Sequence, residues 1–178
     1  MCIAIVALIS ALALMFVTAC SGGASGNAGN AADDAKRTKF GGISFVLPDG
    51  WEASASGDKL EIKAPENKDV IAVMQGNHKK NSVPSGKEEA ALDSYIGGVL
   101  KGIGANTSSI NNANITMQTI DGKTSETAKL TMNLAGYSID TYAFGVIVDD
   151  GITNLMLGST DGAYNKEFEG IINSVKIA

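Results

Sequence analysis

The clearest hydrophobic pattern in the chain predicts a helix from Ser85 to Gly104. Its apolar side chains recur at intervals of three and four residues, which places them on one helical face: Leu92, Tyr95, Ile96, Val99, Leu100 and Ile103. Ser85 and Glu88 have the spacing of a capping box, and Gly104 is a natural stop. Three glycines indicate that this helix packs closely against a sheet: Gly97, Gly98 and Gly102.

A second helix is predicted near the end of the sequence. It would start near Thr160-Asp161, and its apolar side chains again share one face: Tyr164, Phe168, Ile171, Ile172 and Val175. Both helices therefore carry an apolar stripe that has to be buried against another layer of the domain.

Alternation of apolar and polar residues predicts the strands. The segments that show it before the first helix are 43–47, 59–63 and the more continuously apolar 69–76. After that helix, an antiparallel meander is expected from Asn114, with turns at Asp121-Gly122, Ala135-Gly136 and Asp149-Asp150-Gly151. The stretches AFGVIV and NLMLG are apolar on both faces, as in strands covered on both sides. The fold class is therefore α+β: an antiparallel meander flanked by two amphipathic helices.

The first nineteen residues contain no charged side chain and are almost wholly apolar. A helix of that length barely crosses a bilayer, so it suits a signal peptide better than a permanent span. The stretch ends in Val17-Thr18-Ala19-Cys20, which resembles the bacterial lipobox. We predict a lipoprotein signal peptide over residues 1–19 and lipid attachment at Cys20, although no basic residue precedes the apolar run.

Residues 20–38 are rich in Gly, Ser, Ala and Asn and carry no large apolar side chain. They are predicted to form a flexible tether with a reach of about 25 Å. Residues 39–178 then form a single domain. Of the two cysteines in the chain, Cys2 lies in the leader and Cys20 is lipidated, so no disulfide is expected.

Two motifs in this domain resemble those of the PsbP-like superfamily, which includes PsbP, a Ran-binding import factor and LpqN- and DcrB-type lipoproteins. The first is F-x-x-x-S-F-x-L-P-x-G-W from Phe40 to Trp51, and the second is F-x-x-I-I-x-S-V-K-I from Phe168 to Ile177. The resemblance implies a PsbP-like sandwich and a non-catalytic binding or assembly role. A cystatin-like or lipocalin-like domain is the competing fold.

No group of residues in the sequence has the spacing of a known catalytic or metal site. His78 is interpreted as a solvated loop residue, and zinc ligands and a catalytic cysteine are missing. Asp149-Asp150-Gly151 and Asp161-Gly162 supply oxygens for at most a weak calcium site. Trp51 is a candidate ligand platform, or more simply a packing anchor at the edge of the core. No cofactor is expected.

The charge pattern narrows the partners. The formal net charge of −5 comes with scattered lysines, so nucleic acid is not expected as a partner. The favoured function is a lipid-anchored module on the extracytoplasmic face of the cell membrane, or the outer membrane of a two-membrane cell, that binds an envelope protein or glycan. The alternative is an envelope hydrolase that uses Glu126 and Asp140 as a carboxylate pair.

Overall fold

The structure of this chain is a computed structural model that describes residues 37–67 and 69–178. The predicted signal peptide, Cys20 and the tether up to residue 36 lie outside the described residues. Arg37 and Thr38, assigned above to the tether, instead form the first half of a strand.

Ten strands are described, and they form two sheets whose neighbouring strands are all antiparallel. The larger sheet has seven strands in the order β3 (Glu52–Ser56), β4 (Lys59–Lys63), β5 (Ala72–Lys80), β9 (Gly151–Thr160), β8 (Tyr137–Val148), β7 (Lys123–Leu134) and β6 (Asn114–Ile120). The smaller sheet has three: β1 (Arg37–Phe40), β2 (Ile43–Val46) and β10 (Lys176–Ile177). The predicted meander is therefore the run from β6 to β9.

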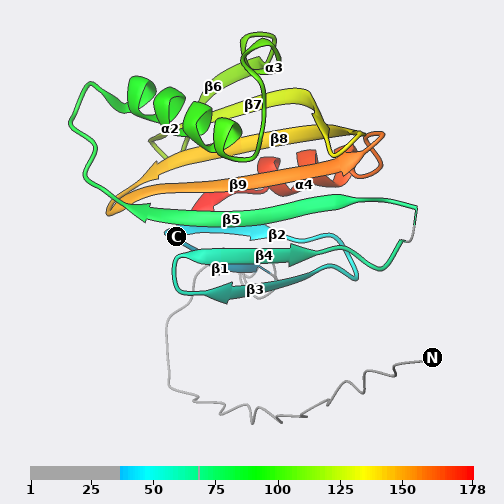
Figure 1. Cartoon of the computed structure of the whole chain (residues 1–178). Helices are drawn as coiled ribbons and strands as arrows, with labels where there is room; N and C mark the ends of the chain where they lie inside the picture. The colour runs from blue at the N-terminus through cyan, green and yellow to red at the C-terminus, as the bar shows by residue number, and fades with distance from the viewer. Residues whose placement is uncertain (1–36, 68) are drawn as a thin grey trace, which may run out of the picture.

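The larger sheet is covered on both faces (Figure 1). Helices α2 (Glu88–Gly102) and α3 (Thr107–Asn111) lie over one face, which we call the α2 face. Helix α4 (Asn165–Asn173) and the smaller sheet lie over the opposite face, which we call the α4 face. The mixed α+β class with antiparallel sheets is confirmed, but the described chain has three helices where two were predicted.

The two central strands explain why both faces need a cover. In β8, Phe144 and Val146 enter the core on the α4 face, while Ala143 enters the core on the α2 face. Every residue of β9 is buried. The expectation that these strands are covered on both sides is therefore confirmed.

Helix α2 begins two residues later than the predicted capping box requires, at Glu88. Gly86 has a φ of +76°, so the chain turns there and Ser85 cannot cap a continuous helix. The N-cap is Lys87, which makes no side-chain capping hydrogen bond. At the other end, Gly104 has a φ of +94° and ends the helix region as predicted.

Helix α4 also begins later than predicted. Thr160 still belongs to β9, and Asp161 and Gly162 both have positive φ values, so they form a turn before the helix. The predicted apolar stripe is correct, because Phe168, Ile171 and Ile172 are buried in the core on the α4 face.

The close approach between α2 and the sheet comes from a glycine of the sheet, which corrects the interpretation of the helix glycines. A Cβ at Gly97, Gly98 or Gly102 would meet no atom within 4 Å. A Cβ at Gly145 of β8 would lie 2.8 Å from Cδ1 of Ile96, which is itself fully buried. The absence of a side chain at Gly145 therefore allows helix α2 to pack closely against the sheet.

These two kinds of glycine should respond oppositely to alanine. In Gly145→Ala the new methyl group pushes Ile96 and Leu92 away from the sheet. Overpacking of this kind lowers the unfolding free energy by about 1–3 kcal/mol. Gly98→Ala adds helix propensity without a clash, so it should stabilise the protein by up to about 1 kcal/mol. Urea unfolding of both variants measures the difference, and a stabilising Gly145→Ala would contradict this packing.

Candidate functional site

A polar groove lies on the α4 face, between helix α4 and the outer strands β6, β7 and β8. It consists of two adjoining hollows of about 230 and 220 Å³ that share Lys129 and Tyr142 in their walls. We call it the α4 groove, and define it by the polar side chains that line it: Thr116, Gln118, Lys129, Thr131, Asp140, Tyr142, Asn165 and Glu169.

Strand register gathers the sheet residues of this groove. Lys129 pairs with Tyr142, and Thr131 pairs with Asp140, across the β7–β8 hairpin. Directly paired residues of antiparallel strands point to the same face, so all four side chains project toward α4. The helix contributes Asn165 and Glu169, which are four residues apart and so lie one turn apart on one helical face.

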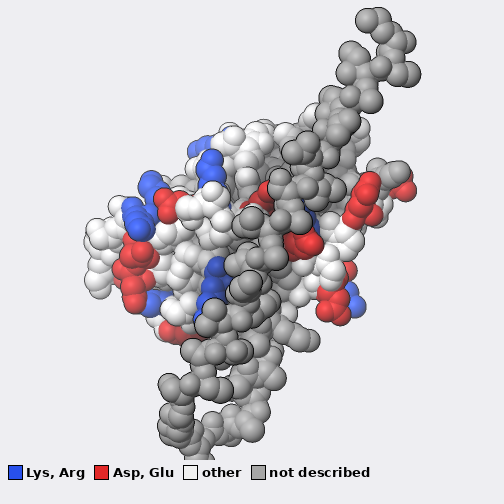
Figure 2. Space-filling model, turned by 90° about the horizontal axis from the view of Figure 1, so that it is seen from below, with Lys and Arg blue, Asp and Glu red and all other residues white. Residues whose placement is uncertain are grey.

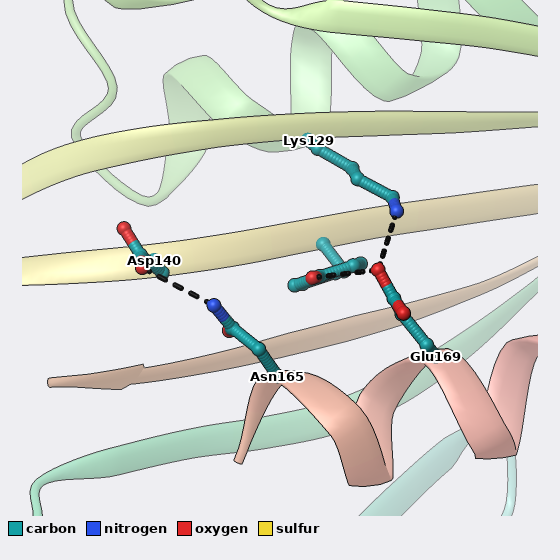
Figure 3. A network of polar contacts seen from close by, with 5 residues as sticks. Lys129, Asp140, Asn165 and Glu169 are labelled. Atoms are coloured by element: carbon teal, nitrogen blue, oxygen red, sulfur yellow. Dashed lines mark hydrogen bonds and ion pairs between the residues drawn. The ribbon is translucent and has the colours of Figure 1, made fainter. Parts of the chain in front are cut away.

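Lys129 and Glu169 bridge the groove from sheet to helix (Figure 3). The Lys129 ammonium donates a 2.8 Å hydrogen bond to Glu169 Oε1, and the Tyr142 hydroxyl donates to the same oxygen at 3.2 Å. The hydrogen bond and charge of Lys129 lower the pKa of the Glu169 carboxyl. Burial, followed by the neighbouring Glu169 charge, raises the pKa of Tyr142. Lys129 Nζ also lies 4.9 Å from the centroid of the Tyr142 ring.

A second set of contacts holds Asp140 at the other end of the groove. Thr131 Oγ1 donates to Asp140 Oδ1 at 2.7 Å. Asn165 Nδ2 donates to Asp140 Oδ2 at 3.3 Å, as Figure 3 shows. The other polar atom of that amide, Asn165 Oδ1, is buried without a hydrogen-bond partner in the described chain. The Asn165 amide is therefore held by Asp140 through its Nδ2 atom, while its Oδ1 atom has no hydrogen bond in the described chain.

The carboxylate pair suggested by the sequence does not form. Asp140 faces α4, whereas Glu126 lies on the α2 face, in line with Ala128 and Leu130 of the same strand. Two carboxyl groups on opposite faces of one sheet cannot flank the same glycosidic bond. The hydrolase mechanism based on Glu126 and Asp140 is therefore wrong.

Glu126 is instead a carboxyl group buried beneath α2. Only 1% of its surface is exposed, and its Oε2 atom has no hydrogen-bond partner among the described residues. Burial, followed by the negative charge of Asp93 on α2, raises the pKa of Glu126 from its ordinary 4.5 to about 7. A charged Glu126 therefore weakens the contact between α2 and the sheet.

Trp51 contributes to the aromatic core. Its ring meets those of Tyr164 and Phe168 edge to face, with centroid distances of 5.2 and 6.1 Å. Trp51 itself remains half-buried at the rim of the core on the α4 face. These contacts are those of a packing anchor that joins the start of β3 to helix α4.

His78 is not a solvated loop residue, because β5 continues to Lys80 and buries it on the α4 face. Its Nδ1 atom lies 2.8 Å from Thr153 Oγ1, and that hydroxyl donates its own hydrogen to the Gly41 carbonyl. Thr153 must therefore accept the Nδ1 hydrogen. The contacts from His78 through Thr153 to Gly41 connect the larger sheet to the turn of the smaller one, so His78 has a structural role.

The aspartates of the predicted acidic turns lie on the surface: Asp149, Asp150 and Asp161. Asp149 pairs with Lys123, which lowers the pKa of Asp149, and Asp150 Oδ1 lies 3.4 Å from His78 Nε2. Within residues 37–67 and 69–178, no three His, Cys, Asp or Glu side chains gather closely enough to hold a metal ion. Charges of both signs are interspersed on the face seen in Figure 2.

Apart from Asp140, the groove residues were not assigned a role from the sequence, although part of the information was present. A two-residue turn at Ala135-Gly136 fixes the register of the hairpin, and that register places Lys129 opposite Tyr142. Docking of α4 over this pair could not be derived in the same way, because it depends on how the helix crosses the sheet.

Comparisons with known proteins address the fold. The sequence matches no known family profile and no curated protein. A protein from Bacteroides thetaiotaomicron VPI-5482 is similar in structure, with 12% identity and a TM-score of 0.52, over 80% of this chain and 48% of that one. This chain thus spans about half the length of the Bacteroides protein.

The solution structure of cyanobacterial PsbP (CyanoP) from Synechocystis sp. PCC 6803 is similar over 88% of this chain and 98% of that one, with 13% identity and a TM-score of 0.51. LpqN of Mycobacterium tuberculosis, described as involved in cell envelope biogenesis, is 13% identical with a TM-score of 0.46, over 76% and 83% of the two chains. The described domain therefore has a PsbP-like α+β fold. In the described part of the chain, no helix is long and apolar enough to cross a bilayer.

The buried Glu126 predicts an unusual pH dependence of stability. The pKa of Glu126 is higher in the folded than in the unfolded chain. Protonation of Glu126 therefore contributes fully to the unfolding free energy below about pH 4.5, and this contribution is lost as the pH rises through about 7. Glu126→Gln should therefore raise the unfolding free energy at pH 8, by on the order of 3 kcal/mol, and change it little at pH 4.

Thermal and urea unfolding across this pH range provide the measurement. Glu61→Gln, at an exposed position of strand β4, is the matched control. Equal effects of Glu126→Gln at pH 4 and pH 8 would show that the Glu126 carboxyl does not titrate in this window.

Proposed function

We propose that this chain is a lipid-anchored, extracytoplasmic binding module that holds a hydroxyl-rich ligand, such as an envelope glycan, in the α4 groove without catalysing a reaction. The observation that supports the ligand class is the composition of the groove. Its walls combine an aromatic ring with amide, carboxylate, ammonium and hydroxyl groups from three strands and one helix.

These groups suit hydroxyl recognition because donors and acceptors alternate within short reach. Lys129 donates, Asp140 accepts, and the amides of Gln118 and Asn165 can do both. The contacts described above fix the positions of Lys129, Asp140 and Asn165, so these three side chains have little entropy left to lose on binding. Tyr142 is only 6% exposed, so its part in the groove is to hold Glu169 in place through its hydroxyl group.

The state of the acidic groups argues for binding over hydrolysis. A glycosidase of the two-carboxylate type needs one acid with a raised pKa to protonate the leaving group. In the α4 groove the pKa of Glu169 is lowered by Lys129. The raised pKa belongs to Glu126, on the other face of the sheet, where α2 covers it.

The proposed location rests on the sequence. An uncharged apolar leader that ends in Val17-Thr18-Ala19-Cys20 is the substrate pattern of lipoprotein processing, and two acyl chains hold a protein stably on a bilayer. A Gly- and Ser-rich stretch between Cys20 and the first strand would let the α4 groove reach ligands beyond the lipid headgroups.

Removal of Lys129 tests the groove. Lys129→Ala removes a charged donor, so binding to the ligand should weaken by about tenfold or more. Co-sedimentation with purified peptidoglycan, and titration with soluble envelope polysaccharide, measure the affinity. The matched control is Lys63→Ala on β4, an exposed lysine of the same sheet that lies outside the groove. Equal affinities of the two variants would contradict a ligand in the α4 groove.

Processing at Cys20 is tested separately from ligand binding. Mass spectrometry of the membrane-extracted protein should show an N-terminus at residue 20 that carries a diacylglyceryl group. Cys20→Ala removes the thiol that accepts the lipid, so this variant should keep residues 1–19. A wild-type protein that retains its leader, or has an unmodified Cys20, would contradict the proposed anchoring.

A further inference from the structure

Strand β6 is an unprotected edge of the larger sheet. It is the last strand beyond β7, and its residues Asn114 to Thr119 are all exposed. The sequence Asn-Ile-Thr-Met-Gln-Thr-Ile contains no charge, no proline and no glycine. Natural sheet edges are usually blocked by such residues, because free backbone groups otherwise pair with another strand. By contrast, β3 at the opposite edge is shorter and begins with Glu52.

The two sides of β6 differ in chemistry. Ile115 and Met117 project on the α2 face and are 47% and 38% exposed, while the polar Asn114, Thr116 and Gln118 project on the α4 face. The Ser125 hydroxyl of β7 donates to the Gln118 carbonyl, which places that carbonyl on the β7 side. Strand alternation then turns the backbone groups of Ile115 and Met117 outward, where a new strand can bind them.

We propose that two copies of this chain pair through their β6 strands, antiparallel to each other, about a two-fold axis at Thr116. In this register Ile115 of one copy faces Met117 of the second copy on one side of the joined sheets. On the other side Asn114 faces Gln118 of the second copy, and Thr116 faces its own counterpart. Apolar groups thus meet apolar groups, and amides meet amides.

The occupant is a second copy because β6 is complementary to itself. A two-fold interface brings the same surface patch together twice, so each contact must suit both partners. An uncharged strand meets no like-charge repulsion across the axis. Helix α3 precedes β6 in the chain, but the side chains of β6 from Asn114 to Thr119 remain exposed. The edge is therefore open to the second copy.

The pairing would also join two binding sites. Thr116 and Gln118 lie both on the paired strand and in the wall of the α4 groove, so the two grooves would meet at the axis. Two linked sites on a repetitive polymer bind more tightly than one site through effective concentration. This consequence rests on the proposed function, whereas the pairing of β6 strands does not.

A charge exchange at Thr116 tests the register. Full-length chains with two different tags are co-expressed and extracted in detergent, and one tag is captured. Wild-type copies should co-purify. Thr116→Glu places two carboxylates on the axis, and Thr116→Lys places two ammonium groups there, so each variant should lose at least tenfold of the co-purification. A Thr116→Glu copy mixed with a Thr116→Lys copy should regain it.

The control applies the same exchange to Ser54, an exposed residue of the opposite edge strand β3, and should leave co-purification unchanged. Regained pairing in the mixed sample also shows that both Thr116 variants fold. A wild-type chain that sediments as a monomer in detergent would overturn the proposal, even if a foreign strand occupies the edge. Equal co-purification of all Thr116 variants would overturn it as well.

Discussion

The burial of β8 and β9 on both faces is the constraint from which the rest of the fold follows. Two antiparallel strands that are apolar on each side cannot face water, so each face of the sheet needs its own cover. Helix α4 and the smaller sheet provide one cover, and helices α2 and α3 provide the other. The chain meets this requirement with two separate cores, since no single layer can contact both faces.

The layers that cover the two faces are attached to the larger sheet in different ways. On the α4 face, Phe168 packs among Trp51, Tyr142 and Tyr164, and the chain continues from the helix into β10, which pairs with β2. On the α2 face, the helix carries two interior glycines, Gly97 and Gly98, and covers the buried Glu126. Ionisation of Glu126 opposes this contact, because its charge has no hydrogen-bond partner for Oε2 among the described residues. Helix α2 is thus the less firmly held layer.

The sequence predicted what depends on short-range pattern. The meander, its three turns and both apolar stripes follow from periodicity and turn chemistry, and they are correct. The helix starts were wrong, because the backbone at Gly86 and Asp161 turns where side-chain spacing alone permits helix. Strand β10 was missed because a two-residue strand has no pattern of its own and exists only through pairing with β2. Opposite faces for Glu126 and Asp140 follow from the turn at Ala135-Gly136, which fixes the hairpin register.

The same register explains why the α4 groove lies beside the free edge. A hairpin brings Lys129 and Tyr142 to one face, and the turn at Asp121-Gly122 places Thr116 and Gln118 on the same face. Helix α4 runs along β8 and β9 and does not lie over β6, so polar side chains of the outer strands remain open to solvent (Figure 3). An incomplete cover therefore accounts both for a hollow lined by polar groups and for an edge strand without a neighbour. A cover laid across β7 and β6 would close the hollow and leave the edge open, because backbone groups at a sheet edge are satisfied only from the side.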